Sequence, residues 1–133
     1  MPAVAVDTHA VVWYLTNDPR LSIPAATALD EASSQGEFIY VPSICLVELT
    51  YLAEKGRLPR SARGRLITWL DDPEMPCRLV PLDRRVADAI ESISRDEIAD
   101  LPDRIVSATA MALGVPLVSR DDRIRSSRLR TIW

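Results

Sequence analysis

Four carboxylates stand where the chain passes from one expected element to the next. Asp7 directly follows an apolar run at residues 4–6, and Asp121 follows "PLVSR". Asp103 opens the helical stretch "LPDRIVSATAMALG", and Glu48 lies early in "SICLVELTYLAEKG". Carboxylate oxygens are the ligands that hard cations such as Mg²⁺ and Mn²⁺ prefer in proteins. If the fold brings these residues together, the sequence indicates an oxygen-ligated metal site.

Such a cluster has a definite chemistry. Mutual repulsion would raise the pKa of some carboxyl groups unless a cation offsets it. A divalent metal held there can activate a water molecule and bind a phosphate oxygen, which phosphodiester hydrolysis requires. Zinc is disfavoured because Cys45, Cys77 and the single histidine, His9, lack the spacing of a zinc site. We interpret both cysteines as reduced core residues and give His9 no catalytic role.

The elements that must position these residues follow from hydrophobic patterning. Short apolar runs predict strands at 4–6, 38–41, 78–80 and 116–118, with a further one in "LRTIW". Between them lie stretches with helical spacing, including 25–32, 61–70 and the segment "LDRRVADAIESI". This alternation predicts an α/β fold with three α/β/α layers around a central, mostly parallel sheet. The chain shows no internal repeat or linker, so residues 1–133 are expected to form one domain.

A parallel sheet would bring the four acids to one edge. In open α/β sheets, ligands bind beyond the carboxyl ends of the strands, where Asp7 and Asp121 are expected. A helix that leaves a strand begins at this edge, which places Glu48 there. The helix over 102–113 is joined to the next strand by only Gly114 and Val115, so it should run antiparallel to that strand and return Asp103 to the same edge.

Helix capping offers a structural explanation for three of these acids. Asp7 could equally be the N-cap of "DTHAVVWYL". Asp103 occupies the third position after the expected N-cap Asp100, as in a capping box. Asp121 or Asp122 could simply end a strand or cap "RIRSS".

Glu48 is harder to explain structurally. Ser43 is expected to cap its helix and Gly56 to end it. The apolar residues at 44, 47, 51 and 52 have the spacing of an inward stripe, and Glu48 takes the missing place in it. The pattern therefore aims a carboxylate at the sheet, although other apolar residues on this helix leave the inward face open to a second choice.

Composition narrows the class of protein. The chain is 47% apolar and 26% charged, and it has neither an apolar segment long enough for a membrane span nor a secretion signal. We therefore expect a cytoplasmic protein. The net charge of −3 argues against binding nucleic acid through a uniformly basic surface. Fifteen of the 16 basic residues are arginine, and five of them lie between positions 120 and 130, where they form either a phosphate-binding patch or a solvated surface.

The ordered motifs resemble a known family. "AVDTHAVVWYL", "SICLVELTYL" and "LPDRIVSATAMALGVPLVSRDDRI" are similar to the motifs of PIN-domain ribonucleases, and most of all to the VapC toxins of type II toxin–antitoxin pairs. The resemblance implies an endoribonuclease that depends on Mg²⁺ or Mn²⁺ and cleaves single-stranded or looped RNA, such as transfer or ribosomal RNA. The acidic quartet maps onto Asp7, Glu48, Asp103 and Asp121, with Thr8, Ser119 and Asp122 in support. The pair "DD" leaves open whether Asp121 or Asp122 is the fourth acid, and the family spacing favours Asp121.

The resemblance also implies partners. Family members look like homodimers held inactive by a VapB-like antitoxin, which contacts operator DNA on behalf of the complex. Trp13, Tyr14, Tyr51 and Leu52 are candidates for dimer or antitoxin contacts, with core packing as the alternative for Trp13. Contacts to RNA are assigned to four arginines near the acidic motifs: Arg104, Arg120, Arg123 and Arg125.

Proteins of other functional classes also have an aspartate directly after their first strand. A receiver domain needs a lysine after a late strand, and the only lysine is Lys55. A haloacid-dehalogenase-type phosphatase needs a second aspartate two residues after the first, where this chain has His9. A PIN domain without activity, serving as a binding module, would be expected to have lost one of the acids. All four are present.

Overall fold

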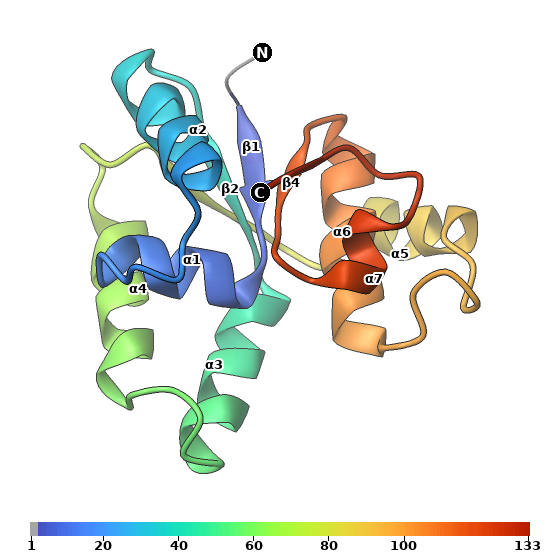
Figure 1. The fold of residues 1–133 in the computed structure, drawn as a ribbon, viewed down its shortest axis with the longest axis horizontal. Coiled ribbons are helices and arrows are strands. Elements are labelled where there is room, and N and C mark those ends of the chain that lie inside the picture. Colours follow the sequence, from blue (N-terminus) through green and yellow to red (C-terminus); the bar gives the residue numbers. More distant parts are fainter. Residues whose placement is uncertain (1–2) are drawn as a thin grey trace.

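The computed structural model describes residues 3–133, and its centre is a sheet of five parallel strands (Figure 1). The strands are β1 (Val4–Val6), β2 (Ile39–Pro42), β3 (Cys77–Val80), β4 (Leu117–Val118) and β5 (Thr131–Ile132). Their order across the sheet is β3-β2-β1-β4-β5. The predicted α/β fold with a central parallel sheet is confirmed, and β1 lies at the middle of it.

Helices cover the sheet from both sides. They are α1 (Thr8–Leu15), α2 (Ile23–Ser34), α3 (Ile44–Glu54), α4 (Ser61–Asp71), α5 (Arg84–Ala89), α6 (Leu101–Leu113) and α7 (Asp122–Arg125). Figure 1 shows α1 to α4 on one side of β1 and α5 to α7 on the other. Both α2 and α6 contact β1 and β2, which gives the three predicted layers. Within residues 3–133, no helix is long and apolar enough to span a membrane.

Two local predictions about helix ends are wrong. Ser43 has a helical backbone and makes no capping bond, because its hydroxyl instead accepts a hydrogen bond from the Leu82 amide at 3.1 Å. The segment "LDRRVADAIESI" is not one helix, since α5 ends at Ala89 and continues as a 3₁₀ turn over Ile90–Ser92. By contrast, Asp100 caps α6, and Gly114 ends it with a left-handed φ of 68°.

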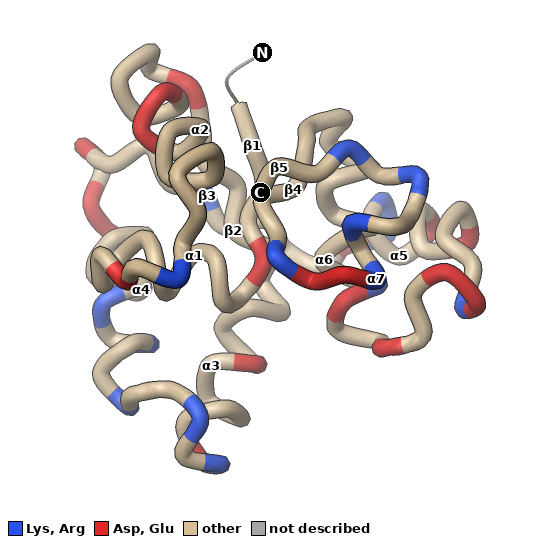
Figure 2. The backbone as a smooth tube through the Cα atoms, in the orientation of Figure 1, with Lys and Arg blue, Asp and Glu red and all other residues tan. Residues whose placement is uncertain are grey.

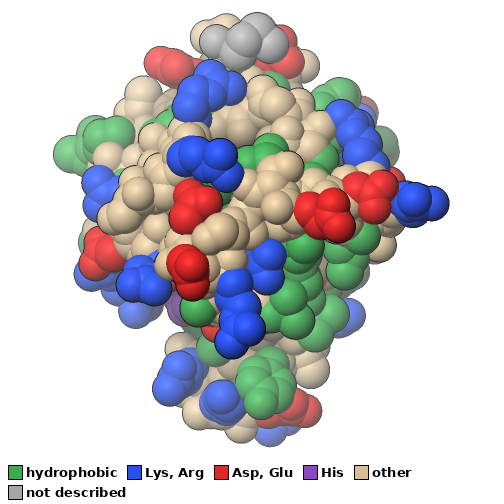
Figure 3. All heavy atoms as spheres, turned by 90° about the vertical axis from the view of Figure 1, so that its right-hand side faces the viewer, with side chains coloured by type: hydrophobic (Ala, Val, Ile, Leu, Met, Phe, Trp, Pro, Cys, Tyr) green, Lys and Arg blue, Asp and Glu red, His purple; other side chains and the backbone are tan. Residues whose placement is uncertain are grey.

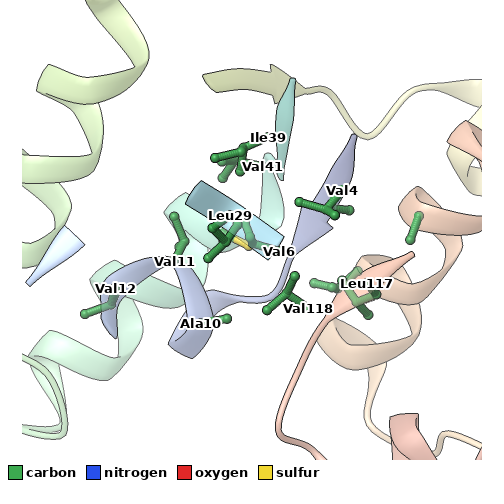
Figure 4. Packing of buried hydrophobic residues seen from close by; sticks show 14 of the residues in the cluster. Val4, Val6, Ala10, Val11, Val12, Leu29, Ile39, Val41, Leu117 and Val118 are labelled. Atoms are coloured by element: carbon green, nitrogen blue, oxygen red, sulfur yellow. The ribbon is translucent and has the colours of Figure 1, made fainter. Parts of the chain in front are cut away.

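The core fixes the position of the sheet edge. Every residue of β1 is buried. Figure 4 shows Val4 and Val6 among the apolar side chains of β2, β4, α1 and α2. The Asp7 amide continues the ladder by donating to the Val118 carbonyl at 3.2 Å. Burial of apolar side chains on both faces of β1 therefore holds Asp7 at the carboxyl end of the central strand.

Candidate active site

A groove with a volume of about 740 Å³ opens at this edge of the sheet. Its lining includes all four predicted acids, which come from four separate segments of the chain. Asp100, Asp122 and Thr8 also line it. The parallel topology thus brings together carboxylates that are up to 114 positions apart in sequence, from Asp7 to Asp121.

Asp7 is both a helix cap and a groove residue. Its Oδ1 accepts a hydrogen bond from the Ala10 amide at 2.9 Å, so the capping interpretation and the site interpretation hold together. Burial, with a smaller contribution from the charge of Asp121, raises the pKa of Asp7 to about 6 despite the lowering effects of the Ser119 hydroxyl and the Ala10 amide. A carboxylate in such a place is destabilising when ionised unless a cation joins it.

Glu48 is held by a hydroxyl from another helix. The Thr8 hydroxyl donates to Glu48 Oε1 at 2.6 Å, which links the start of α1 to α3. Burial raises the pKa of Glu48, the bond from Thr8 lowers it, and the charge of Asp100 adds to the rise. A bond of this kind fixes the direction of the carboxylate within the groove.

The predicted inward stripe of α3 is wrong for Val47 and Tyr51, whereas Ile44 and Leu52 are half-buried and pack against the core as predicted. The buried residues of this helix are Cys45 and Leu49, whereas Val47 and Tyr51 are 62% and 60% exposed. Val47 and Tyr51 line the groove beside Glu48 instead. The residue pattern correctly grouped them with Glu48 on one helix face, but that face looks into the groove and not into the core.

Asp103 and Asp121 complete the acidic set. Burial raises the pKa of Asp103 to about 7, with further contributions from the charges of Asp100, Asp121 and other acids. Asp121 caps α7 by accepting from the Ile124 amide at 3.0 Å, and its own amide donates to Ser119 Oγ at 3.1 Å. Ser119 is fully buried, so it fixes the turn that presents Asp121. Asp122 is more exposed but also lines the groove.

The acidic set has a donor chemistry suited to a hard cation. None of the four acids forms a salt bridge with another residue in the described range 3–133. All donors are carboxylate or hydroxyl oxygens, which suits Mg²⁺ or Mn²⁺ and not zinc or copper. Within the same range, no three side chains of His, Cys, Asp or Glu lie close enough together to form a ready metal cluster. The carboxylates line the groove without converging on one point.

The arginines assigned to RNA lie in different surroundings. Arg120 lines the groove, whereas Arg123 and Arg125 are exposed on α7 and are not among the lining residues. The prediction for Arg104 needs correction, because its guanidinium donates to the carbonyls of Ile90 at 3.2 Å and Ile93 at 2.7 Å. Arg104 therefore anchors α6 to the segment after α5 and does not reach the groove.

Other groove residues were missed by sequence reasoning. Arg20, Lys55 and Arg57 line it, although they lie in connections after α1 and α3, outside the acidic motifs. His9 also lines it, and its ring centroid lies 5.5 Å from that of Trp13. The position of His9, two residues after the capping Asp7, was the one sequence signal available for a groove residue.

The apolar residues proposed for partner contacts divide in the same way. Trp13 is only 5% exposed and belongs to the core, which supports the alternative interpretation for this residue. Tyr14 is half-buried and donates a hydrogen bond to Asp30 at 2.7 Å. Leu52 is half-buried, and Tyr51 alone among the four is largely exposed.

Comparison with known proteins places this architecture in a family. The PIN domain matches residues 4–128. Ribonuclease VapC22 from Mycobacterium tuberculosis is 30% identical over the full length of both chains. DNA-bound VapBC from Salmonella typhimurium is similar in structure, with a TM-score of 0.69, 20% identity and coverage of 98% of this chain and 97% of that one. FitAcB from Neisseria gonorrhoeae has a TM-score of 0.64, 20% identity and coverage of 96% and 95%. The chain therefore belongs to the PIN-domain family, as a member of the VapC type.

Proposed function

We propose that this protein is an endoribonuclease that depends on a divalent metal and acts as the toxin of a type II toxin–antitoxin pair. The observation that carries the proposal is the placement of Asp7, Glu48, Asp103 and Asp121 around one groove with no basic partner for any of them in the described residues. The name of the curated relative, a ribonuclease, supports the same activity. The expected substrate is single-stranded or looped RNA, with transfer and ribosomal RNA as candidates.

Asp7, Asp103 and Asp121 are proposed to hold Mg²⁺ or Mn²⁺, with Glu48 on the facing helix as a further ligand or proton acceptor. A bound ion would supply positive charge for phosphate oxygens and lower the pKa of a coordinated water. The chain's own part is to keep the carboxylates at the end of a rigid sheet. Small side-chain rotations would be needed to bring them onto one ion, since they line the groove without forming a closed cluster.

Two hydroxyl residues are proposed to orient the acids. Thr8 fixes one oxygen of Glu48 and leaves the other free to accept a proton from water or to bind the metal. Ser119 holds the Asp121 amide and lies close enough to Asp7 to lower its pKa. Both side chains are buried, so their orientation is set by packing. Such outer residues commonly tune the affinity of a metal site.

Partners are proposed from the related complexes. The structurally similar proteins include VapBC complexes, some bound to DNA. We infer that a VapB-like antitoxin binds this chain and that operator DNA is contacted through the antitoxin. A homodimer is also proposed, with exposed Tyr51 as a candidate contact residue. Figure 3 shows acidic and basic side chains interspersed on the α5 to α7 side, which gives this face no uniformly basic surface for nucleic acid.

Cleavage of total cellular RNA tests the proposal. The purified chain would be incubated with Mg²⁺, Mn²⁺ or EDTA, alongside Asp7→Asn and Asp83→Asn. Asp83 is a matched control, because it caps α5 through the same type of bond, to the Val86 amide at 3.1 Å, and is not among the groove residues. The wild type and Asp83→Asn should cleave with metal only, and Asp7→Asn should not.

Two outcomes would contradict the proposal. Equal cleavage by Asp7→Asn and the wild type would show that the acidic groove is not the site of RNA cleavage. RNA that binds but stays intact with the wild type in both metals would instead indicate a PIN domain that serves as a binding module.

A further inference from the structure

Three of the four basic residues that line the groove, Arg20, Lys55 and Arg120, lie against aromatic rings. The guanidinium carbons of Arg20 and Arg120 lie 5.0 Å and 5.7 Å from the centre of the Trp13 ring. The Lys55 ammonium lies 4.5 Å from the centre of Tyr51, at the other end of α3 from Ser43. Stacking on an aromatic face stabilises a cation and restricts its side chain. These charges are therefore held at defined places beside the acids.

Arg20 and Arg120 differ in whether a carboxylate compensates their charge. Arg20 donates through both Nε and an Nη nitrogen to the Asp18 carboxylate, at 3.1 Å and 2.8 Å, which largely neutralises it. Arg120 is exposed and takes part in no ion pair within residues 3–133. Its neighbours in the chain are Ser119 and Asp121, so its backbone is fixed by the same turn that presents the acid. Arg120 is thus an uncompensated cation of the groove that directly precedes one of the four carboxylates in sequence.

We propose that Arg120, together with Arg20 on the Trp13 ring, forms a phosphate-binding subsite that holds a single-stranded RNA next to the four carboxylates. This inference rests on the proposed ribonuclease function and adds the residues that position the strand. RNA is a polyanion, and an acidic groove repels it everywhere except near cations. The subsite supplies attraction on one side of the bond to be cleaved.

The geometry favours phosphate over a nucleobase as the bound group. Trp13 is 5% exposed, so its ring supports the arginines and offers little surface on which a base could stack. Asp18 already accepts from two nitrogens of Arg20, so Arg120 is the one of the two whose guanidinium can form a bidentate contact with phosphate oxygens. Figure 2 shows basic and acidic segments of the backbone next to each other where the chain enters α7.

Salt-dependent RNA binding tests the subsite separately from cleavage. A fluorescent single-stranded RNA of mixed sequence would be titrated into Asp7→Asn protein in Mg²⁺, so that the probe stays intact. The same background would carry Arg120→Ala, Arg20→Ala, Arg120→Lys or Arg95→Ala. Arg95 is the matched control, because it is exposed and lies outside the groove lining.

The expected result is an ordered one. Arg120→Ala should weaken binding about 5- to 10-fold and reduce the slope of log K against log salt by about 1, the loss of one phosphate contact. Arg20→Ala should have a smaller effect because Asp18 already compensates its charge, and Arg120→Lys should be intermediate. Arg95→Ala should match the parent. In cleavage by otherwise wild-type protein, Arg120→Ala should raise KM more than it lowers kcat.

The outcomes separate the two proposals. Suppose that the wild type cleaves RNA but that Arg120→Ala and Arg20→Ala bind RNA with the same affinity and salt dependence as Arg95→Ala. The subsite is then overturned and the ribonuclease function stands. Such a result would indicate that the two arginines bind an acidic segment of a protein partner instead of RNA. If the wild type neither binds nor cleaves RNA, both proposals fail.

Discussion

Helices α1 and α5 begin with the same device in different surroundings. Asp7 and Asp83 each accept a hydrogen bond from the amide three residues later, at 2.9 Å and 3.1 Å. Asp83 is exposed at the surface, whereas Asp7 ends the central strand and lies among other carboxylates. Capping alone therefore explains Asp83 but not the position of Asp7. The comparison shows that a helix cap can also be a groove carboxylate when the helix starts at the carboxyl end of a buried strand.

Asp121 is likewise both a helix cap, at α7, and a groove carboxylate. Its substitution gives the largest effect on RNA cleavage that we expect. Asp121→Asn should retain the capping bond but reduce RNA cleavage by more than the ~10- to 100-fold typical of residues outside a metal's direct ligands. Asp122→Asn, one residue further along the exposed side, should have a small effect. Cleavage rates of the two variants under Mg²⁺ would measure this. The reverse order would make Asp122 the fourth acid.

Removing the hydroxyl that holds Glu48 should have the next largest effect. Thr8→Val keeps the shape of a buried side chain but deletes the 2.6 Å bond to Glu48. Cleavage should fall by about 10- to 100-fold, as for an outer residue of a metal site. Thr8→Ser, which restores the hydroxyl, should recover most of the rate. Equal loss in both variants would show that packing at this position matters and the hydroxyl does not.

Stability without metal should distinguish the two caps by pH. The folded-state pKa of Asp7 is about 6, above its ordinary value, so the folded protein binds this proton more tightly than the unfolded chain. Above that pKa the ionised group destabilises the fold, and the penalty disappears as the pH falls toward 4. At pH 7.5 in EDTA, Asp7→Asn should be more stable than the wild type by about 1 to 3 kcal/mol. Urea unfolding at pH 7.5 and pH 4.5 would measure the difference, which should shrink at the lower pH, while Asp83→Asn should show no such gain.

The smallest effect concerns the caps themselves. Asp83→Ala removes a cap bond and should cost about 1 kcal/mol of unfolding free energy. Asp7→Ala removes a similar bond but also a half-buried charge that is repelled by Asp121, so its net cost in EDTA should be smaller. Thermal unfolding of the two variants would show the order. A larger loss for Asp7→Ala would mean that its capping role dominates.

Topology made much of the candidate site predictable. Asp7, Asp103 and Asp121 were placed correctly at one sheet edge because strand order and a two-residue connection at 114–115 leave few alternatives. Their capping roles were also visible, since aspartate is common before a helix. The sequence predicted where these strands and helices begin and end, and short-range rules describe such boundaries well.

The errors have a common physical origin in ambiguous side-chain direction. Helix α3 is apolar on most of its circumference, so periodicity did not fix which face is buried, and Tyr51 was assigned inward although it is 60% exposed. The anchoring of Arg104 by the Ile90 and Ile93 carbonyls depends on tertiary contacts that its neighbours in sequence do not reveal. The same holds for Arg20, which reaches the groove only because Trp13 and Asp18 hold it there.

Binding of Mn²⁺ to the free protein tests most directly whether Asp7 differs from Asp83. Electron paramagnetic resonance would follow free Mn²⁺ during titration of the wild type, Asp7→Asn and Asp83→Asn. The wild type and Asp83→Asn should bind the ion with equal affinity, and Asp7→Asn should bind it at least about 10-fold more weakly. Equal binding by the wild type and Asp7→Asn would contradict the account, because the carboxylate at the end of β1 would then be a helix cap and nothing more.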